Sequence, residues 1–327
     1  MRDWLLTLAL FACGKDGAGP TRAPIEGTPV ESENSREATT GTADAAALPP
    51  HRAYPDLATA LSATIPADAR VVGFGELHAR TDRAATTSTL ASFTRALPAF
   101  ADRLSDLVLE TWQVDPTCGA PAVAATARIE TQVKRPEVTR SELAELADAA
   151  RAAHIQLHAM TLTCADYAAI APTDGEVGPT GEAPRPAGGA VGVPTPRDTA
   201  SPIDPVAMLT LTTRELRRIA ASAVVHRDRE PGHRPWIAVY GGALHNDRFP
   251  DASVAEWSYA AEADRATGGH FVEIDLIVPE LAAADAASRR APWFRLAGAA
   301  RDPATPILVW TRGERSFVVL LPPRPPT

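Results

Sequence analysis

Cysteine, aromatic residues and long apolar runs are all scarce in this sequence. The 327 residues include 3 Cys, and 6% of them are Phe, Trp or Tyr. After the first dozen residues, no run reaches the ~18 apolar residues that a membrane-spanning helix needs. We therefore expect a mature chain that has no such helix.

Clusters of basic residues are also missing. The net charge of -8 and the pI near 5.5 argue against a nucleic-acid partner and favour a small-molecule or peptide ligand. A hydrophobic content of 45% allows a large core to form without a cofactor. The sequence has no Gly-x-Ser-x-Gly elbow, P-loop or dinucleotide fingerprint, which excludes the commonest hydrolase, kinase and dehydrogenase sites.

The N-terminus is typical of a bacterial lipoprotein. Residues 1–13 form a short positive-then-apolar segment that ends in Leu-Phe-Ala-Cys, a lipobox-like sequence. We expect this segment to be a signal peptide and Cys13 to carry the lipid. The lipid would anchor the protein in the cell envelope on the extracytoplasmic side, at the outer membrane or the periplasmic face. The alternative is an N-terminal helix with an incidental cysteine.

The other two cysteines form an even pair if the chain is exported to an oxidising compartment. Cys118 and Cys164 each follow a predicted strand, and a βαβ connection would place these strands side by side. We predict a disulfide between them. Two unpaired buried thiols are the alternative.

Composition divides the chain into segments. Residues 14–50 are rich in Gly, Pro, Ser, Thr and Ala, which predicts a disordered tether. A single α/β domain is expected over residues 51–327. A Pro/Gly-rich insertion interrupts it at about 172–205.

Within the domain, hydrophobic periodicity predicts strands that alternate with helices. Strands are expected at 71–74, 107–109, 155–160, 236–240 and 270–278, with a hairpin of 307–310 and 317–321. Helices are expected from residue 57, from Thr81 or Asp82 to about Leu104, at 139–153 with a capping box of Thr139 and Glu142, at 209–225 and at 254–263. Residues 112–137 are expected to be irregular. The pattern indicates an α/β fold: a mainly parallel sheet flanked by helices, with an antiparallel C-terminal edge hairpin.

Two segments place a histidine just after the end of a predicted strand. One is Gly75-Glu76-Leu77-His78, and the other is Gly242-Ala243-Leu244-His245. A third predicted strand ends at Glu110. Ligands bind beyond the carboxyl ends of parallel strands, so we expect these side chains to meet at one site.

Two kinds of chemistry suit this set of residues. Glu76, His78, Glu110 and His245 are typical ligands of a divalent metal. Alternatively, a histidine acts as a general base while the carboxylates orient it or supply a proton. Other interpretations also remain: His78 as a hydrogen-bonded loop residue, Glu110 as an acid with a raised pKa or a plain strand-end carboxylate, and Tyr240 as a ligand contact or a core residue.

Segments 71–78 and 240–250, together with Glu110, resemble the superfamily of ChaN-like haem-binding lipoproteins, Tiki/TraB proteins and erythromycin esterase-like enzymes. The resemblance spans roughly residues 66–280. It assigns Gly75, His78, Gly242 and His245 to two Gly-x-x-His motifs, and Glu76 and Glu110 to acidic positions at strand ends. It implies metal-dependent peptide cleavage, metal-independent ester hydrolysis or iron-porphyrin binding. The insertion at 172–205 departs from all three groups.

We therefore predict an extracytoplasmic, membrane-anchored hydrolase of esters or peptides, in which His78 or His245 activates water. The alternative is a haem-binding lipoprotein without catalysis, in which Gly75, Gly242 and Tyr240 contact the cofactor. A surface or assembly protein that needs no turnover is the third hypothesis.

Overall fold

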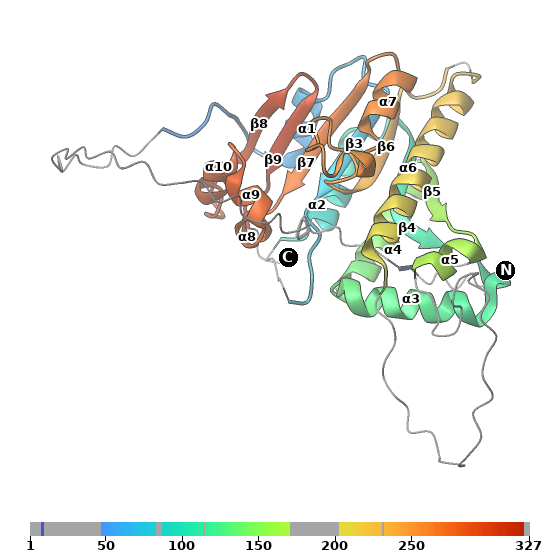
Figure 1. Ribbon diagram of the computed structural model, residues 1–327. Coiled ribbons are helices and arrows are strands. Elements are labelled where there is room, and N and C mark those ends of the chain that lie inside the picture. Colours follow the sequence, from blue (N-terminus) through green and yellow to red (C-terminus); the bar gives the residue numbers. More distant parts are fainter. Residues whose placement is uncertain are drawn as a thin grey trace, which may run out of the picture.

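The computed structural model describes residues 8–9, 47–82, 87–113, 115–170, 203–230 and 232–323. In these residues one mixed sheet lies between layers of helices (Figure 1). The nine strands of the described residues are β1 (Leu8–Ala9), β2 (Arg52–Tyr54), β3 (Val71–Glu76), β4 (Leu104–Gln113), β5 (Gln156–Thr161), β6 (Trp236–Gly242), β7 (Phe271–Ile277), β8 (Ile307–Gly313) and β9 (Ser316–Leu320).

The α-helices of the same residues are α1 (Leu57–Thr64), α2 (Thr89–Ala96), α3 (Gly119–Val133), α4 (Val138–Ala152), α5 (Cys164–Ile170), α6 (Pro205–Arg227), α7 (Ala260–Ala266), α8 (Pro279–Ala284), α9 (Ala286–Arg290) and α10 (Phe294–Ala299). Three short 3-10 helices are η1 (Leu97–Ala99), η2 (Pro116–Cys118) and η3 (Ala255–Trp257). None of the helices in the described part of the chain is both long and apolar enough to cross a membrane.

The strand order confirms the predicted fold class. The sheet runs β5-β4-β6-β3-β7-β9-β8-β2, and β1 pairs with the last residues of β4. All pairings from β5 to β9 in this order are parallel. The C-terminal hairpin of β8 and β9 is antiparallel, as predicted. The short strand β2, which the sequence did not predict, pairs with β8 and forms the outer edge.

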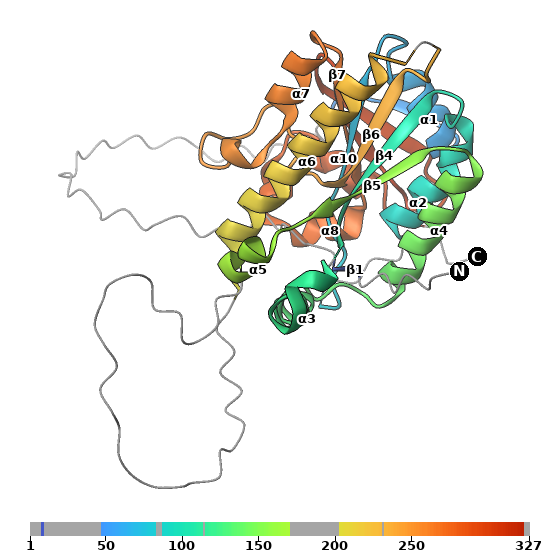
Figure 2. The same ribbon diagram turned by 90° about the vertical axis from the view of Figure 1, so that its right-hand side faces the viewer.

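Helices cover both faces of the sheet. Figure 2 shows α6 and α7 on one side and α1, α2 and α4 on the other. Side chains alternate along β3, so Phe74 packs against Phe93 of α2 with ring centroids 4.8 Å apart, while Val71 faces the core beneath α6 and α7. The fully buried β3 is typical of a parallel strand that is covered on both faces.

The structure joins Cys118 and Cys164 in a disulfide, with their Cα atoms 5.1 Å apart. This is the pair that the sequence predicted. The two cysteines follow β4 and β5, which are parallel neighbours. The bond therefore ties the start of α3 to the start of α5, beyond the carboxyl ends of these strands (Figure 1).

One expected helix start and one expected capping box were wrong. The helix after His78 begins at Thr89, and Ser88 caps it by accepting a hydrogen bond from the Ala91 N–H at 3.1 Å. Thr81 and Asp82 are not its cap. The capping box of Thr139 and Glu142 is not formed either, because α4 starts at Val138 and no side chain caps its N-terminus.

Residues 112–137 are more regular than predicted. Strand β4 continues to Gln113, and α3 occupies most of the rest of the segment. The alanine-rich sequence of α3 lacks a strong apolar stripe, which explains why periodicity missed it. The insertion expected at 172–205 falls largely outside the described residues, and α6 already starts at Pro205, with Asp204 as its N-cap.

Candidate active site at the strand ends

The parallel register of the sheet brings the predicted site residues together. Strand β6 lies between β3 and β4, and Glu76 at the end of β3 pairs with Gly242 at the end of β6. The loops that carry His78 and His245 therefore leave the same edge of the sheet, where β4 brings Glu110. Glu76, His78, Glu110 and His245 form one buried cluster, with side-chain exposures of 10%, 4%, 2% and 1%.

Glu76 holds His78 in one orientation. Its Oε1 atom lies 2.6 Å from Nδ1 of His78, and its Oε2 atom accepts a hydrogen bond from the Tyr240 hydroxyl at 2.5 Å. Nη1 of Arg135 lies 3.5 Å from Oε1. Burial opposes ionisation of Glu76, but these contacts outweigh it and lower the pKa of the carboxyl below its ordinary 4.5. Because an ionised Glu76 only accepts, Nδ1 of His78 carries a proton.

Hydrogen bonds also fix the orientation of the His245 ring, on the face of the sheet that α6 covers. Its Nδ1 atom lies 2.9 Å from the Trp257 carbonyl oxygen and 2.8 Å from the Thr213 hydroxyl of α6. A carbonyl oxygen only accepts, so Nδ1 is the protonated nitrogen and Nε2 carries the lone pair. Burial lowers the pKa of His245 below 6.5, and the ring is neutral at pH 7.

Both histidines turn their Nε2 atoms toward the same oxygen of Glu110. Oε1 of Glu110 lies 3.7 Å from Nε2 of His78 and 3.9 Å from Nε2 of His245. Within the described residues, neither Nε2 of His78 nor Oε1 of Glu110 has a hydrogen-bond partner. Two imidazole nitrogens and one carboxylate oxygen therefore converge in a buried volume.

Glu110 is not the acid with a raised pKa that was one interpretation of the sequence. Burial acts to raise its pKa, but the two imidazoles and the Gly242 N–H, which donates to Oε2, bring the pKa down to about 2. The carboxyl is thus an anion at neutral pH. Its ionised state strengthens the demand for a donor or a positive charge at Oε1.

Two glycines of β6 allow this close approach. A Cβ atom on Gly241 would lie 2.9 Å from the Cβ atom of Glu110, and one on Gly242 would lie 3.0 Å from Nε2 of His78. Any larger residue would displace the carboxylate or the imidazole. The glycine of the second Gly-x-x-His motif thus has a steric role at the site itself.

The other residues expected to contact a cofactor lie elsewhere. Gly75 lies against other residues, and a Cβ atom on it would lie 2.6 Å from Oδ1 of Asn246. The ring of Tyr240 is in the core, 4.8 Å from the ring of Phe93, and only its hydroxyl reaches Glu76. The core interpretation of Tyr240 is therefore confirmed, with a hydrogen bond to the site added.

The described residues form no preformed metal or haem site at this cluster. No group of three or more His, Cys, Asp or Glu side chains in the described part of the chain is placed to hold a metal. A haem iron needs an imidazole nitrogen that is open to the ligand. The available nitrogens of His78 and His245 are both turned toward Glu110, on side chains that are 4% and 1% exposed.

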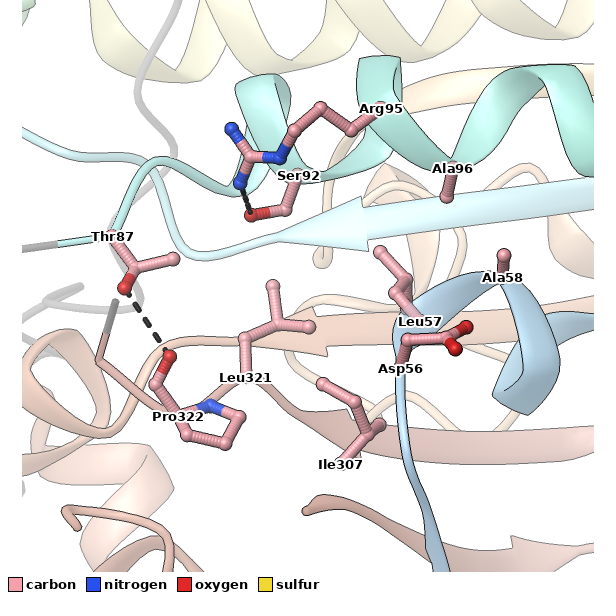
Figure 3. A pocket seen from close by; sticks show the side chains of 10 residues that line it. All are labelled: Asp56, Leu57, Ala58, Thr87, Ser92, Arg95, Ala96, Ile307, Leu321 and Pro322. Carbon is pink, nitrogen blue, oxygen red and sulfur yellow. Dashed lines mark hydrogen bonds between the residues drawn. The ribbon is translucent and has the colours of Figure 1, made fainter. Parts of the chain in front are cut away.

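One hollow adjoins this cluster and a second shares one lining residue with the first. One of about 290 Å³ is lined by Glu76, Arg135 and the first turns of α2 and α4. Another of about 260 Å³ lies between α1, α2 and the start of β8, with Leu57, Ile307 and Leu321 on its apolar walls (Figure 3). Thr87 lines both, and its hydroxyl donates to the Pro322 carbonyl oxygen at 3.3 Å.

Two residues of the site were missed from the sequence. Thr213 lies within a helix far from either Gly-x-x-His motif, so no local pattern marks it. Arg135 follows α3, in the segment that was expected to be irregular. Only the packing of α6 and α3 against the strand ends brings these side chains to His245 and Glu76.

Comparison with known protein families, curated proteins and solved structures finds no match to this chain. The resemblance to the ChaN-like and Tiki/TraB superfamily stays a prediction. Cys13, the expected site of lipid attachment, lies outside the described residues.

Proposed function

We propose that this protein is a hydrolase of esters or peptides that activates water at the buried cluster of His78, Glu110 and His245. The convergence of the two imidazoles on one oxygen of Glu110 supports the proposal. With Nε2 of His78 unprotonated, a water molecule can donate one hydrogen bond to Oε1 of Glu110 and one to Nε2 of His78.

The expected chemistry follows from the hydrogen bonds. Nε2 of His78 accepts a proton from the water as it attacks a carbonyl carbon. Glu76 stabilises the imidazolium that forms, because its ionised carboxylate accepts from Nδ1 at 2.6 Å. The proton then passes from His78 to the leaving oxygen or nitrogen. Glu110 and His245 orient the water, and no step requires a metal.

Substrate must reach a cluster that is closed in this structure. Nε2 of His78 and Oε1 of Glu110 are both buried, so binding requires the surrounding segments to move apart. The absence of a side chain on Gly242 leaves room beside Nε2 of His78, which a Cβ atom would approach to 3.0 Å. The hollow beside Glu76 is where we place the part of the substrate next to the reacting carbonyl.

A panel of chromogenic esters and peptide amides tests this function. We expect wild-type protein to turn over members of one class. His78→Gln and Glu110→Gln should each lower kcat by about 10²-fold or more, the usual contribution of general acid–base groups. His226→Gln is the control, because this histidine of α6 is 63% exposed and far along the chain from the cluster. Turnover that is equal in all four proteins, or absent from the whole panel with wild type, would overturn the proposal.

We further propose that Cys13 anchors the protein by lipid in the cell envelope, on the extracytoplasmic side. The lipobox-like sequence supports this, and multiple acyl chains would hold the protein firmly. Cleavage before Cys13 would remove the two-residue strand β1 and leave β4 paired with β5 and β6. Mass spectrometry of the mature N-terminus tests it. An unmodified chain that still begins at Met1 in the soluble fraction would rule it out.

A further inference from the structure

The hollow of about 290 Å³ beside Glu76 has an unequal distribution of charge. Four charged side chains line it: Glu76, Arg80, Arg135 and Glu142. Arg80 binds Asp82 through two nitrogens, at 2.9 and 3.1 Å, and Nζ of Lys134 lies 3.5 Å from the same carboxylate. Arg135 lies 3.5 Å from Glu76.

Glu142 is the lining carboxylate that forms no ion pair within the described residues, although Arg95 of α2 also acts on its charge. The hydroxyl of Ser88 donates to its Oε2 atom at 2.8 Å, and this hydroxyl is neutral. Burial and the nearby Glu76 raise the pKa of Glu142 above its ordinary 4.5. An anion in a partly buried hollow is stabilised when a cation binds beside it, because the local dielectric constant is lower than that of water.

We propose that this hollow binds an ammonium group through Glu142. Resting on the proposed function, this makes the substrate a peptide or an aminoacyl ester with a free amino group close to the carbonyl that is attacked. Glu142 then sets specificity, and it takes no part in the proton transfers at His78.

Other elements around the hollow fit a small polar group. Ser88 and Thr89 at the start of α2 and Thr139 of α4 supply hydroxyls, while Leu90 and Leu281 supply apolar walls. Arg135 opposes a cation, but the nearby carboxylate of Glu76 neutralises it. A volume of about 290 Å³ is at the lower end of that of ligand pockets and suits a terminal residue better than a long chain.

Binding of two matched probes separates charge from shape. Glycinamide carries an ammonium group, and N-acetylglycinamide has an amide in its place. In NMR titrations of the full chain, we expect glycinamide to shift the amide signals of Ser88 and Thr89 and to bind about tenfold more tightly than N-acetylglycinamide, the ratio of one moderately buried ion pair. Raising the ionic strength should reduce this ratio.

The variants assign the effect to one side chain. Glu142→Gln keeps an acceptor for Ser88 and should bind both probes equally, whereas Asp148→Asn, at a 73% exposed position farther along α4, should keep the preference. In wild type, affinity for glycinamide should rise through a midpoint above pH 4.5, because Glu142 loses its proton there while Glu76, whose pKa is lowered, is already ionised.

Equal binding of the two probes to wild type, no binding of glycinamide at the hollow, or equal losses in both variants would each overturn the assignment. Turnover tests the proposed hydrolase function separately from this binding site. Hydrolysis that does not distinguish free from acetylated amino groups would leave the hydrolase in place and remove the ammonium site. Binding of glycinamide without any turnover would keep the ammonium site and remove the proposed hydrolase function.

Discussion

Nδ1 of His78 lies 2.6 Å from Oε1 of Glu76, so the proton of this imidazole points away from Glu110. Nε2 of His78 faces Oε1 of Glu110 at 3.7 Å. In the proposed resting form Nε2 carries a lone pair, and a lone pair and an anion do not attract each other in a buried site. The proposed activation of water depends on the orientation of His78 and on the negative charge of Glu110.

Replacing Glu76 should allow the His78 ring to carry its proton on either nitrogen. In Glu76→Gln the amide gives the ring a neutral partner, so the preference for a proton on Nδ1 weakens. We expect 15N NMR of the His78 ring to show a mixture of tautomers. Tyr240→Phe, which removes one hydrogen bond to Glu76 but keeps the carboxylate, should leave the Nδ1-protonated form dominant. An unchanged His78 spectrum in Glu76→Gln would show that Glu76 does not set the tautomer.

A methyl group on Gly241 should destabilise the fold. The added Cβ atom would lie 2.9 Å from that of Glu110, so we expect Gly241→Ala to cost about 1–3 kcal/mol of unfolding free energy through overpacking. Gly298→Ala is the matched control, because no atom lies within 4 Å of a Cβ at this helical position. The control should be neutral or gain up to about 1 kcal/mol. Urea denaturation measures both, and equal stability of the two variants would contradict the packing argument.

Removing the disulfide should lower the free energy of unfolding, because the unfolded chain gains conformational entropy. The bond closes a separation of 46 residues, for which chain entropy predicts about 4 kcal/mol. We expect Cys118→Ser/Cys164→Ser to lose up to that amount in urea denaturation. Alkylation of the unreduced, unfolded wild-type protein checks the bond itself. Labelling of both thiols would mean that the bond does not form.

The ion pair of Asp106 and Arg227 should support stability at neutral pH and lose its effect in acid. Burial raises the pKa of Asp106, but hydrogen bonds from His158 at 2.7 Å and Arg227 at 2.6 Å outweigh it and hold the pKa below 3.8. A carboxyl with a lowered pKa stabilises the fold above its unfolded value, and this stabilisation disappears as the pH falls through the folded value.

Asp106→Asn should therefore cost about 3 kcal/mol at pH 7, because it leaves Arg227 without its buried partner. The difference from wild type should shrink below pH 3.8. The exposed pair of Asp148 and Arg151, 73% and 60% exposed, provides a control in Asp148→Asn, with an expected change below about 0.5 kcal/mol. Urea midpoints measured from pH 7 down to acid decide the matter, and a pH-independent loss would contradict the ionic explanation.

Much of the fold and of the cluster could be predicted from the sequence. Short apolar runs that end in glycine mark β3 and β6 because these strands are buried on both faces. The position of Glu110 followed from the same rule for β4. The meeting of His78 with His245 required only that parallel strands end at one edge.

The remaining features depend on tertiary packing. The contact of Thr213 with His245 needs α6 to cross β6, and the placement of Arg135 needs α3 to lie beyond the strand ends. Neither helix carries a local signal of that role. Sequence patterns could not predict the lowered pKa of Glu110 either. The Gly242 N–H and the imidazoles that lower it come from other parts of the chain.

A high-resolution crystal structure of the mature protein at neutral pH tests the central claim most directly. The account predicts a single water molecule at about 2.7–3.2 Å from both Nε2 of His78 and Oε1 of Glu110. A direct hydrogen bond between His78 and Glu110, or a metal ion identified at this position by anomalous scattering, would contradict it.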